Sequence, residues 1–324
     1  MQAYLGVDVG SVSTNLVVMN EEEEVIESLY LRTEGQPVKT VQEGLRLLGE
    51  KLPEFIKIAG VGVTGSARML ISVLIGADIV KNEITAHAVA VSKKVPGAQT
   101  IMEIGGQDSK IIIMRNGIVV DFAMNTVCAA GTGSFLDQQA ARLQIPIEKF
   151  SRLALKAQNP VRIAGRCAVF AESDMIHKQQ LGHATEDIVA GLCDALVRNY
   201  LNNVGKGKEI LAPVVFQGGV AANHGIKAAF EKVLQLELIV PPNYDVMGAL
   251  GCCYLAREAV QGRPTKFKGW QAAENAFRPT SFECKGCPNM CEVIQIYENE
   301  DLIARWGDRC GKWSNRLNIE QKTG

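Results

Sequence analysis

The N-terminal pattern of apolar and polar residues predicts a hairpin. Residues 4–7 and 15–19 are apolar and flank the turn-rich sequence VGSVST, a pattern typical of two strands joined by a tight loop. A third strand-like segment follows at residues 25–31, and residues 65–74 and 83–93 show the apolar spacing expected of helices. The first part of the chain is therefore predicted to be three strands followed by helices.

The same order of elements returns in the second part of the chain. Residues 101–104 and 111–114 are apolar and flank GGQDSK, so that Asp8 of the first hairpin corresponds to Glu103 of the second. A third strand is again predicted, at residues 117–123. Helical spacing follows at residues 131–143, 168–175 and 186–201. This repeat of strands and helices indicates an internal duplication with two similar α/β halves.

The remaining segments complete the expected domain organisation. A short buried strand at residues 214–216 leads through GGVAANHG into a helix at 221–234, and a further strand is predicted at 238–240. Beyond residue 262 the chain contains three Trp and four Cys and has little helical periodicity. We therefore expect three parts: a first domain at residues 1–95, a second at 96–262 whose final helix (about 246–261) packs back on the first, and a small Cys-rich module at 263–324.

Composition narrows the class of protein. Of the 324 residues, 47% are hydrophobic and 21% are charged, which is typical of a folded globular chain. The formal net charge is −1 and the basic residues are scattered, so we expect no nucleic-acid partner. The longest stretch without a full charge, residues 211–226, is too short to span a bilayer, so we expect no membrane segment. The N-terminus lacks a basic start followed by an apolar run, and this predicts a cytoplasmic protein.

The first hairpin loop has the composition of a phosphate-binding turn. Gly10 allows unusual backbone angles, and the hydroxyls of Ser11, Ser13 and Thr14 offer hydrogen bonds to an anion. Asp8 would hold a Mg²⁺ ion, mostly through water. An ordinary hairpin turn with a solvated Asp explains the same residues about as well.

Two further glycine-rich segments extend this pattern. GGQDSK provides a Gln able to orient water, and turns in two facing halves can clamp a triphosphate from both sides. GGVAAN joins a strand to a helix and suits adenosine packing, with Asn223 as the helix cap, although simple strand-to-helix turn chemistry also explains it. The ATP contacts predicted in these two segments are Gly105, Gly106, Gln107, Lys110, Gly218, Gly219, Val220 and Asn223.

These motifs resemble a known superfamily. The order DVGSVST, GGQDSK and GGVAAN is similar to that of acetate and sugar kinases, actin and the heat-shock ATPases, over about 260 residues. Within that superfamily, GGQDSK, NTVCAAGTGSFL, GRCAVF and GALG resemble the activator ATPases of 2-hydroxyacyl-CoA dehydratases and benzoyl-CoA reductases, including related ATP-dependent reductases of double-cubane cluster proteins. The resemblance implies a duplicated ribonuclease H-like (actin- or sugar-kinase-like) α/β ATPase of two domains.

The resemblance also implies an activity and its cofactors. It implies binding of ATP, ADP and Mg²⁺, and transfer of single electrons to a partner iron-sulfur dehydratase or reductase, with a ferredoxin or flavodoxin as the upstream donor. We assign Asp8, Gln107 and Asp108 to catalysis, with Gln107 positioning the attacking water. ATP would close the two halves of each subunit and change the angle between subunits. Glu83 and His87, one helical turn apart, are explained about as well by an ordinary hydrogen bond and receive no role.

The nine cysteines of a chain without a secretory leader indicate metal or redox chemistry rather than disulfides. Cys128 and Cys167 each precede a predicted helix, whose N-terminus stabilises a thiolate. Two thiolates are too few for a 4Fe-4S cluster, so a homodimer would complete one shared cluster, and the resemblance implies the same arrangement. The alternative is that both are buried free cysteines.

A second group of cysteines lies in the C-terminal module. Their spacing is tight, in a segment otherwise short of apolar core, so that a bound metal would supply folding free energy. Zinc and a further iron-sulfur cluster are both compatible with four thiolates. The compact activators that the chain resembles lack this segment. The predicted ligands are Cys284, Cys287, Cys291 and Cys310.

Two other functions are compatible with the superfamily. A sugar or N-acetylhexosamine kinase would need a carboxylate base beside a polar sugar pocket, and no convincing motif for one is found. A non-redox ATPase of the actin or chaperone type would be indifferent to oxygen. An ATP-dependent electron donor is the function that the sequence favours.

Overall fold

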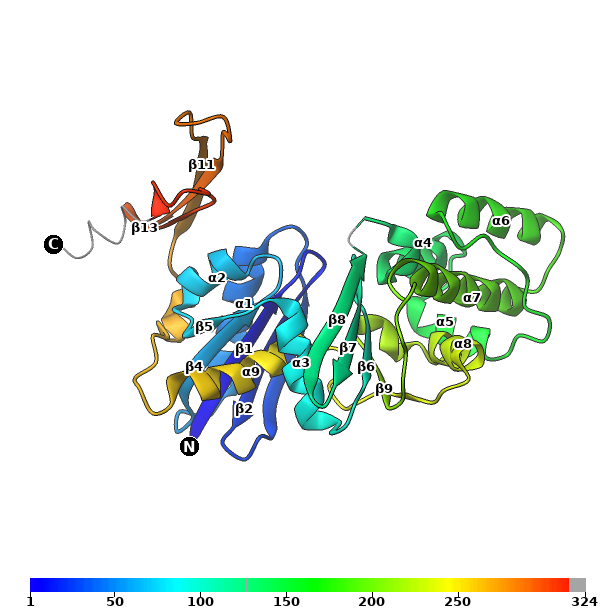
Figure 1. Cartoon of the computed structure of the whole chain (residues 1–324), viewed down its shortest axis with the longest axis horizontal. Coiled ribbons are helices and arrows are strands. Elements are labelled where there is room, and N and C mark those ends of the chain that lie inside the picture. Colours follow the sequence, from blue (N-terminus) through cyan, green and yellow to red (C-terminus); the bar gives the residue numbers. More distant parts are fainter. Residues whose placement is uncertain (126, 315–324) are drawn as a thin grey trace. The chain divides into compact units, whose positions relative to one another are not determined.

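The computed structural model describes residues 1–125 and 127–314, and its contacts divide the chain into two compact units (Figure 1). The first unit contains Met1–Lys81 and the chain from Leu255 onward, and the second contains Asn82–Tyr254. None of the helices in the described ranges combines the length and the apolar character that a membrane crossing requires.

The first unit is built on a five-stranded sheet with the order β3-β2-β1-β4-β5. β1 and β2 are its central antiparallel pair, and β1 also pairs in parallel with β4. Leu5, Val7, Leu16 and Val18 are fully buried in its core. The strands span Gln2–Val9 (β1), Ser13–Asn20 (β2), Val25–Arg32 (β3), Lys57–Thr64 (β4) and Ile79–Val80 (β5), and the helices span Pro37–Lys51 (α1) and Arg68–Ile75 (α2).

The second unit repeats this plan with the strand order β10-β9-β6-β7-β8. Its strands are Thr100–Ile104 (β6), Ser109–Arg115 (β7), Ile118–Asn125 (β8), Val214–Gln217 (β9) and Leu238–Ile239 (β10). Its helices are Glu83–Lys94 (α3), Gly133–Arg142 (α4), Ile147–Ala154 (α5), Ala168–Gln180 (α6), Thr185–Asn203 (α7) and His224–Leu234 (α8), together with the first part of α9 (Met247–Val260). α7 lies at the centre of this unit, since most of its residues from Ile188 to Tyr200 are buried.

Strand directions confirm the internal duplication. In each sheet three antiparallel strands lead into two strands added in parallel, with β1 and β6 at the switch between the two modes. Asp8 and Glu103 occupy corresponding positions near the carboxyl ends of β1 and β6. The predicted α/β fold with two similar halves is therefore confirmed.

The C-terminal segment forms a sheet that the apolar pattern did not predict. A short helix, η3 (Trp270–Ala273), packs on α1, since a side chain at Gly49 would contact Trp270. Three antiparallel strands follow: β11 (Phe277–Glu283), β12 (Glu292–Glu298) and β13 (Asp301–Trp306).

The division into units differs from the expected boundaries at residues 95 and 262. α3 belongs to the second unit, because its side chains bond to β7 and β9. The second half of α9 belongs to the first unit, where Ala256 and Val260 pack against Gly60 of β4. α1, β4 and α5 were not predicted, and α8 begins at His224 rather than at residue 221.

Candidate functional site

The β1–β2 loop of the first unit is a tight turn closed by backbone bonds. The N–H of Gly10 donates to the carbonyl oxygen of Ser13 at 2.9 Å. Gly10 does not adopt positive φ, contrary to expectation. Glycine suits this position for a steric reason, because a Cβ there would lie only 3.1 Å from the Ser13 carbonyl oxygen. Ser11 is exposed and Ser13 is half-buried, so both hydroxyls remain accessible.

Thr14 has a different environment from the two serines. Its side chain is fully buried, and its hydroxyl bonds to that of Thr33 at 2.9 Å, while Thr33 in turn donates to the carbonyl oxygen of Gly10 at 2.9 Å. The Thr14 hydroxyl therefore stabilises the base of the loop, and a contact between Thr14 and a phosphate would come from its backbone.

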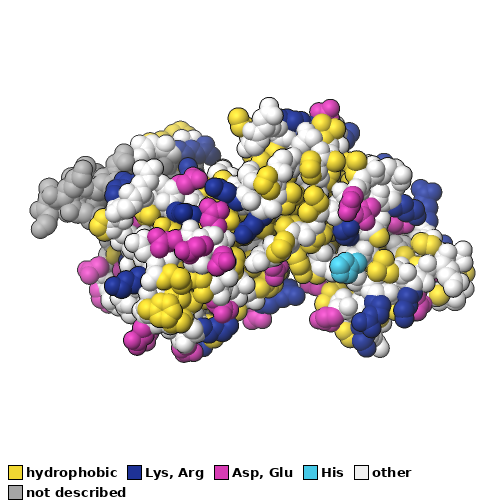
Figure 2. Space-filling model, turned by 90° about the horizontal axis from the view of Figure 1, so that it is seen from below, with side chains coloured by type: hydrophobic (Ala, Val, Ile, Leu, Met, Phe, Trp, Pro, Cys, Tyr) yellow, Lys and Arg dark blue, Asp and Glu magenta, His cyan; other side chains and the backbone are white. Residues whose placement is uncertain are grey.

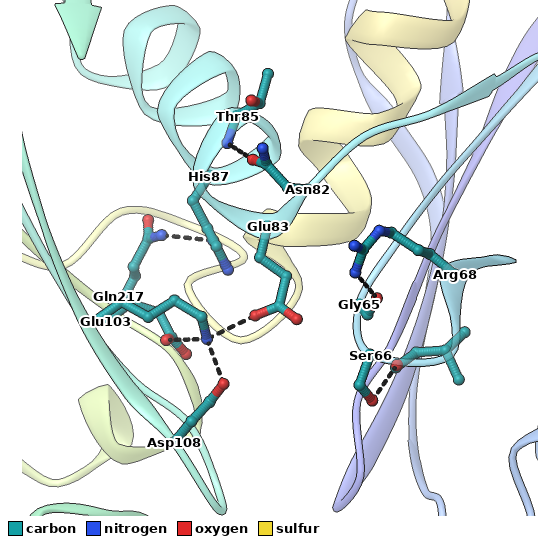
Figure 3. Close-up of polar contacts among 12 residues, drawn as sticks. Gly65, Ser66, Arg68, Asn82, Glu83, Thr85, His87, Glu103, Asp108 and Gln217 are labelled. Atoms are coloured by element: carbon teal, nitrogen blue, oxygen red, sulfur yellow. Dashed lines mark hydrogen bonds and ion pairs between the residues drawn. The ribbon is translucent and has the colours of Figure 1, made fainter. Parts of the chain in front are cut away.

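A second turn lies beside this loop and was not predicted as part of a site. Thr64 pairs with Asp8 across β1 and β4, and the chain then turns through Gly65. Gly65 has φ +95°, and a Cβ there would overlap the backbone of Val9. The hydroxyl of Ser66 donates to the carbonyl oxygen of Val9 at 3.2 Å (Figure 3). A glycine directly after a parallel strand is the sequence signal that could have identified this turn.

The GGQDSK loop of the second unit is held by the N-terminus of α4. The N–H groups of Gly133 and Ser134 donate to the carbonyl oxygens of Gly105 and Gly106, both at 2.8 Å. The N–H of Gly105 donates to the carbonyl oxygen of Asp108 at 3.0 Å, which closes the turn. Gln107, at the tip of this turn, is exposed.

Lys110 lies in a cluster of three carboxylates, those of Glu83, Glu103 and Asp108, which are labelled in Figure 3. Its Nζ is 2.8 Å from Glu83 Oε2, 2.9 Å from Asp108 Oδ2 and 3.0 Å from Glu103 Oε2. The Lys110 side chain is 3% exposed, whereas those of Glu83 and Asp108 are 18% and 30% exposed. Lys110 was predicted to contact ATP; in the structure its ammonium joins α3 to the GGQDSK loop.

Burial and charge set the protonation of this cluster. Burial opposes the charge on Lys110, but the three carboxylates outweigh it and hold the pKa of Lys110 well above its usual range. Burial raises the pKa of Glu103 to about 8, against the opposing effect of the Lys110 charge. Burial therefore makes Glu103 easier to protonate than an ordinary glutamate, and the Lys110 ammonium links it to Glu83 and Asp108.

His87 extends this network to the third glycine-rich segment. The amide N–H of Gln217, the last residue of β9, donates to His87 Nδ1 at 2.8 Å (Figure 3). Burial, and to a smaller extent the Lys110 charge, lowers the pKa of His87 to about 3, so the ring is neutral. Glu83, His87 and Glu103 are residues that the sequence left without a role. Glu83 and His87 find their partners, Lys110 and Gln217, on strands that follow later in the chain.

The GGVAAN segment forms the predicted turn between a strand and a helix. Gly218 has φ +87°, and a Cβ there would overlap the carbonyl oxygen of Ile104. The Asn223 side chain accepts hydrogen bonds from the N–H groups of Gly225 and Ile226 at 3.0 and 3.2 Å. Asn223 is therefore confirmed as the cap of α8.

Cys128 and Cys167 are brought close together by Asn199 of α7. The Asn199 amide N–H groups approach the Cys128 sulfur at 3.7 Å and the carbonyl oxygen of Gly165 at 2.6 Å. The Cys128 sulfur lies 3.8 Å from the carbonyl oxygen of Arg166, the residue before Cys167. Both thiols are partly exposed, so they are not the buried cysteines of the alternative interpretation.

The local structure before each of these cysteines differs. Cys167 is the N-cap of α6, a helix of 13 residues, as predicted. Cys128 precedes only a three-residue 3-10 turn, and α4 begins later, at Gly133. The thiol of Cys128 is instead held through its backbone, because Asn125 accepts from the N–H of Cys128 at 2.9 Å and donates to its carbonyl oxygen at 2.8 Å.

The C-terminal cysteines lie on two loops at one end of the β11–β13 sheet. The indole N–H of Trp313 donates to the Cys284 sulfur at 3.3 Å and, with the N–H of Gly286, lowers the pKa of this thiol. Cys287 and Cys310 are exposed and Cys291 is partly exposed. Within residues 1–125 and 127–314, no group of three or more His, Cys, Asp or Glu side chains is arranged to hold a metal ion.

Comparison with known proteins gives the family. The (R)-2-hydroxyglutaryl-CoA dehydratase activating ATPase of Acidaminococcus fermentans is 34% identical over 258 residues, which cover 78% of this chain and 96% of that protein. The crystal structure of component A of this dehydratase superposes with a TM-score of 0.73 at 31% identity and covers 80% of this chain and 100% of that one.

A second solved structure gives the same result. The activator of 2-hydroxyisocaproyl-CoA dehydratase from Clostridium difficile, solved with bound ADPNP, has a TM-score of 0.71 at 33% identity and covers 81% of this chain and 97% of that one. Residues 5–256 match the model of a family of ATPases, and this range ends before the Cys-rich segment. The chain therefore belongs to the BadF/BadG/BcrA/BcrD ATPase family.

Proposed function

We propose that this ATPase is a one-electron donor, which couples ATP hydrolysis to electron transfer into a partner iron-sulfur dehydratase or reductase. The observation that carries the proposal is that Asn199 contacts both the Cys128 sulfur and the backbone of Gly165 and Arg166, directly before Cys167. The names of the relatives support an activating role, because they describe ATPases and activators of acyl-CoA dehydratases.

The two thiols fit one half of a 4Fe-4S site. Both are partly exposed, and N–H groups of the kind that Asn199 directs at Cys128 stabilise sulfur ligands of a cluster. A cluster needs about four thiolates, so a second copy of the chain would provide its own Cys128 and Cys167. When bound, such a cluster takes up and releases one electron at a time.

Exposed apolar residues near the cysteines support a dimer. Val127, next to Cys128, is 94% exposed, and Val169 and Phe170, which follow Cys167, are 68% and 66% exposed. Figure 2 shows that hydrophobic side chains are exposed on the face that it draws. Such a patch beside an incomplete metal site favours contact with another protein surface.

The nucleotide roles follow from the loops of each unit. We assign Mg²⁺ to Asp8, held mostly through water, and phosphate contacts to the backbone and exposed hydroxyls of the β1–β2 loop. Gln107, exposed at the tip of its turn, positions the attacking water, and Lys110 holds Asp108 and Glu83 in place. ATP contacts are further assigned to Gly105, Gly106 and the GGVAAN turn.

The proposal is tested by anaerobic purification followed by iron and sulfide determination and electron paramagnetic resonance with ATP or ADP. About four irons per dimer are expected, with a nucleotide-sensitive signal after reduction. Cys128→Ala should lose the iron and keep the fold, whereas Cys193→Ala, a change at a buried thiol of α7, should keep both. An iron-free monomer that hydrolyses ATP would overturn the proposal.

A further inference from the structure

The C-terminal sheet has very little apolar core of its own. Among its described residues, from 277 to 314, only Cys284, Val293, Ile296 and Ala304 are buried. A sheet of this size normally needs a metal, a disulfide or a larger core to be stable. One of the four buried residues is a cysteine, and all four cysteines of this C-terminal segment are free thiols.

Three of the cysteines lie on the loop that joins β11 to β12. The N–H of Cys284 donates to the carbonyl oxygen of Cys291 at 2.8 Å, so the first and last residues of this loop face each other across the hairpin. The N–H of Met290 donates to the carbonyl oxygen of Cys287 at 3.2 Å and tightens the turn between them. The hairpin therefore fixes the backbone positions of three thiols within one loop.

The sulfur of Cys284 is surrounded by N–H donors. It accepts hydrogen bonds from the Trp313 indole and from the N–H of Gly286, two residues further on. A Cβ at Gly286 would lie 3.3 Å from Lys312 Nζ and 3.4 Å from the Cys284 sulfur, so the ammonium of Lys312 is also close. The N–H of Gly286, two residues after Cys284, is a donor of the kind that orients a sulfur ligand of a metal ion.

The fourth cysteine is carried by a loop that is fixed to this hairpin. Asp308 accepts from the N–H groups of Trp313 and Ser314 at 2.8 and 3.5 Å and closes the loop that contains Cys310. The Trp313 ring packs edge-to-face on Phe282 of β11, with 4.9 Å between centroids. The loop of Cys310 is thus held against the strand that leads to Cys284.

We propose that Cys284, Cys287, Cys291 and Cys310 bind a single Zn²⁺ ion as a tetrathiolate site that stabilises the C-terminal sheet. Cys287 and Cys310 are exposed on loops, so their thiols can turn onto the ion while β11, β12 and β13 keep their pairing. Four thiolates in tetrahedral geometry select zinc over harder ions. The site lies beyond residue 256, where the family match ends, and does not rest on the proposed electron transfer.

The test uses the full chain with Cys128→Ala, so that iron bound at that cysteine does not contribute. The protein is purified anaerobically without metal-affinity chromatography, and zinc, iron and sulfide are counted. About one zinc per chain is expected, falling to near zero in Cys287→Ser and in Cys310→Ser, and unchanged in Cys193→Ala. Both serine variants change exposed residues, so the packing of the buried core is not altered directly.

A second measurement follows the stability of the sheet. Removal of zinc by a chelator should change the tryptophan fluorescence, to which Trp313 contributes, and should lower the unfolding temperature of the sheet in the parent chain. The chelator should have no effect in Cys287→Ser. Iron and sulfide lost together in the serine variants would overturn the single-zinc site in favour of a cluster. Absence of metal from the parent chain would overturn the site altogether.

Discussion

Replacing Lys110 with Met removes an ammonium that lies within 3.0 Å of three carboxylates. Loss of one partner from a buried ion pair costs about 3–5 kcal/mol, because the remaining charge is left uncompensated. Two features place this substitution near the lower end of that range. The pKa of Glu103 is already raised to about 8 by burial, so this carboxyl takes a proton readily. Glu83 and Asp108 are 18% and 30% exposed and can reach water.

We therefore expect Lys110→Met to lower the free energy of unfolding by about 3 kcal/mol. At about 2–4 °C per kcal/mol for a domain of this size, the unfolding temperature should fall by roughly 6–12 °C. Lys208→Met is the matched control, because Lys208 pairs at 2.6 Å with an Asp121 side chain that is 53% exposed. Such a surface pair is screened by solvent and should contribute little to stability, so Lys208→Met should unfold close to the parent temperature.

The assay is thermal and urea unfolding of the two variants and of Lys110→Met combined with Glu83→Gln. Removing one carboxylate in the absence of the ammonium should recover part of the lost stability, which a double-mutant cycle measures directly. Two results would refute this reasoning. The first is that Lys110→Met is no less stable than Lys208→Met, and the second is that the loss of stability in the double variant equals the sum of the losses in Lys110→Met and Glu83→Gln. Either result would mean that the three-carboxylate network is not the reason that Lys110 is buried.

Three further outcomes are expected. Gly218→Ala should destabilise the protein by about 1–3 kcal/mol in urea unfolding, because its φ of +87° and the carbonyl oxygen of Ile104 exclude a side chain; wild-type stability would contradict this. Burial lowers the folded-state pKa of His87 to about 3. The neutral ring therefore contributes fully to the free energy of unfolding above the unfolded pKa of about 6.5, and this contribution is lost as pH falls toward 3. Stability should therefore decline more steeply over this window in the parent than in His87→Gln, and equal slopes would refute the assignment. Asn199→Ala should weaken iron retention about tenfold in a chelator challenge, while unchanged retention would show that its bond to Cys128 is incidental.

The hairpins and the duplication could be predicted because both depend on local patterns. β1, β2, β6 and β7 are continuous apolar runs interrupted by glycine-rich turns, and period and turn chemistry identify such strands. β4 was missed because its buried half, with the sequence GVGVT, is rich in glycine and joins the sheet through parallel pairing with β1. α1 has a clear apolar face formed by Val41, Leu45 and Leu48, so its spacing was available as a signal.

The candidate site could be predicted from the sequence only in part, for a different reason. The glycine-rich turns were found because each one is a single contiguous segment. The partners of Lys110 come from a helix, a strand and a loop, and the contact between Asn199 and Cys128 joins residues 71 positions apart. Charge pairing of this kind is set by sheet register and helix packing, which no local pattern of residues encodes.

Comparison of the two duplicated halves shows how their charges have diverged. Asp8 and Glu103 hold equivalent places on β1 and β6, but Asp8 is half-buried whereas Glu103 is 5% exposed and bonds to Lys110. An ionised Glu103 would add negative charge beside Glu83 and Asp108. Burial opposes this charge, because it raises the pKa of Glu103 and so favours the protonated form. In the second half the carboxyl at this position is therefore used to hold Lys110.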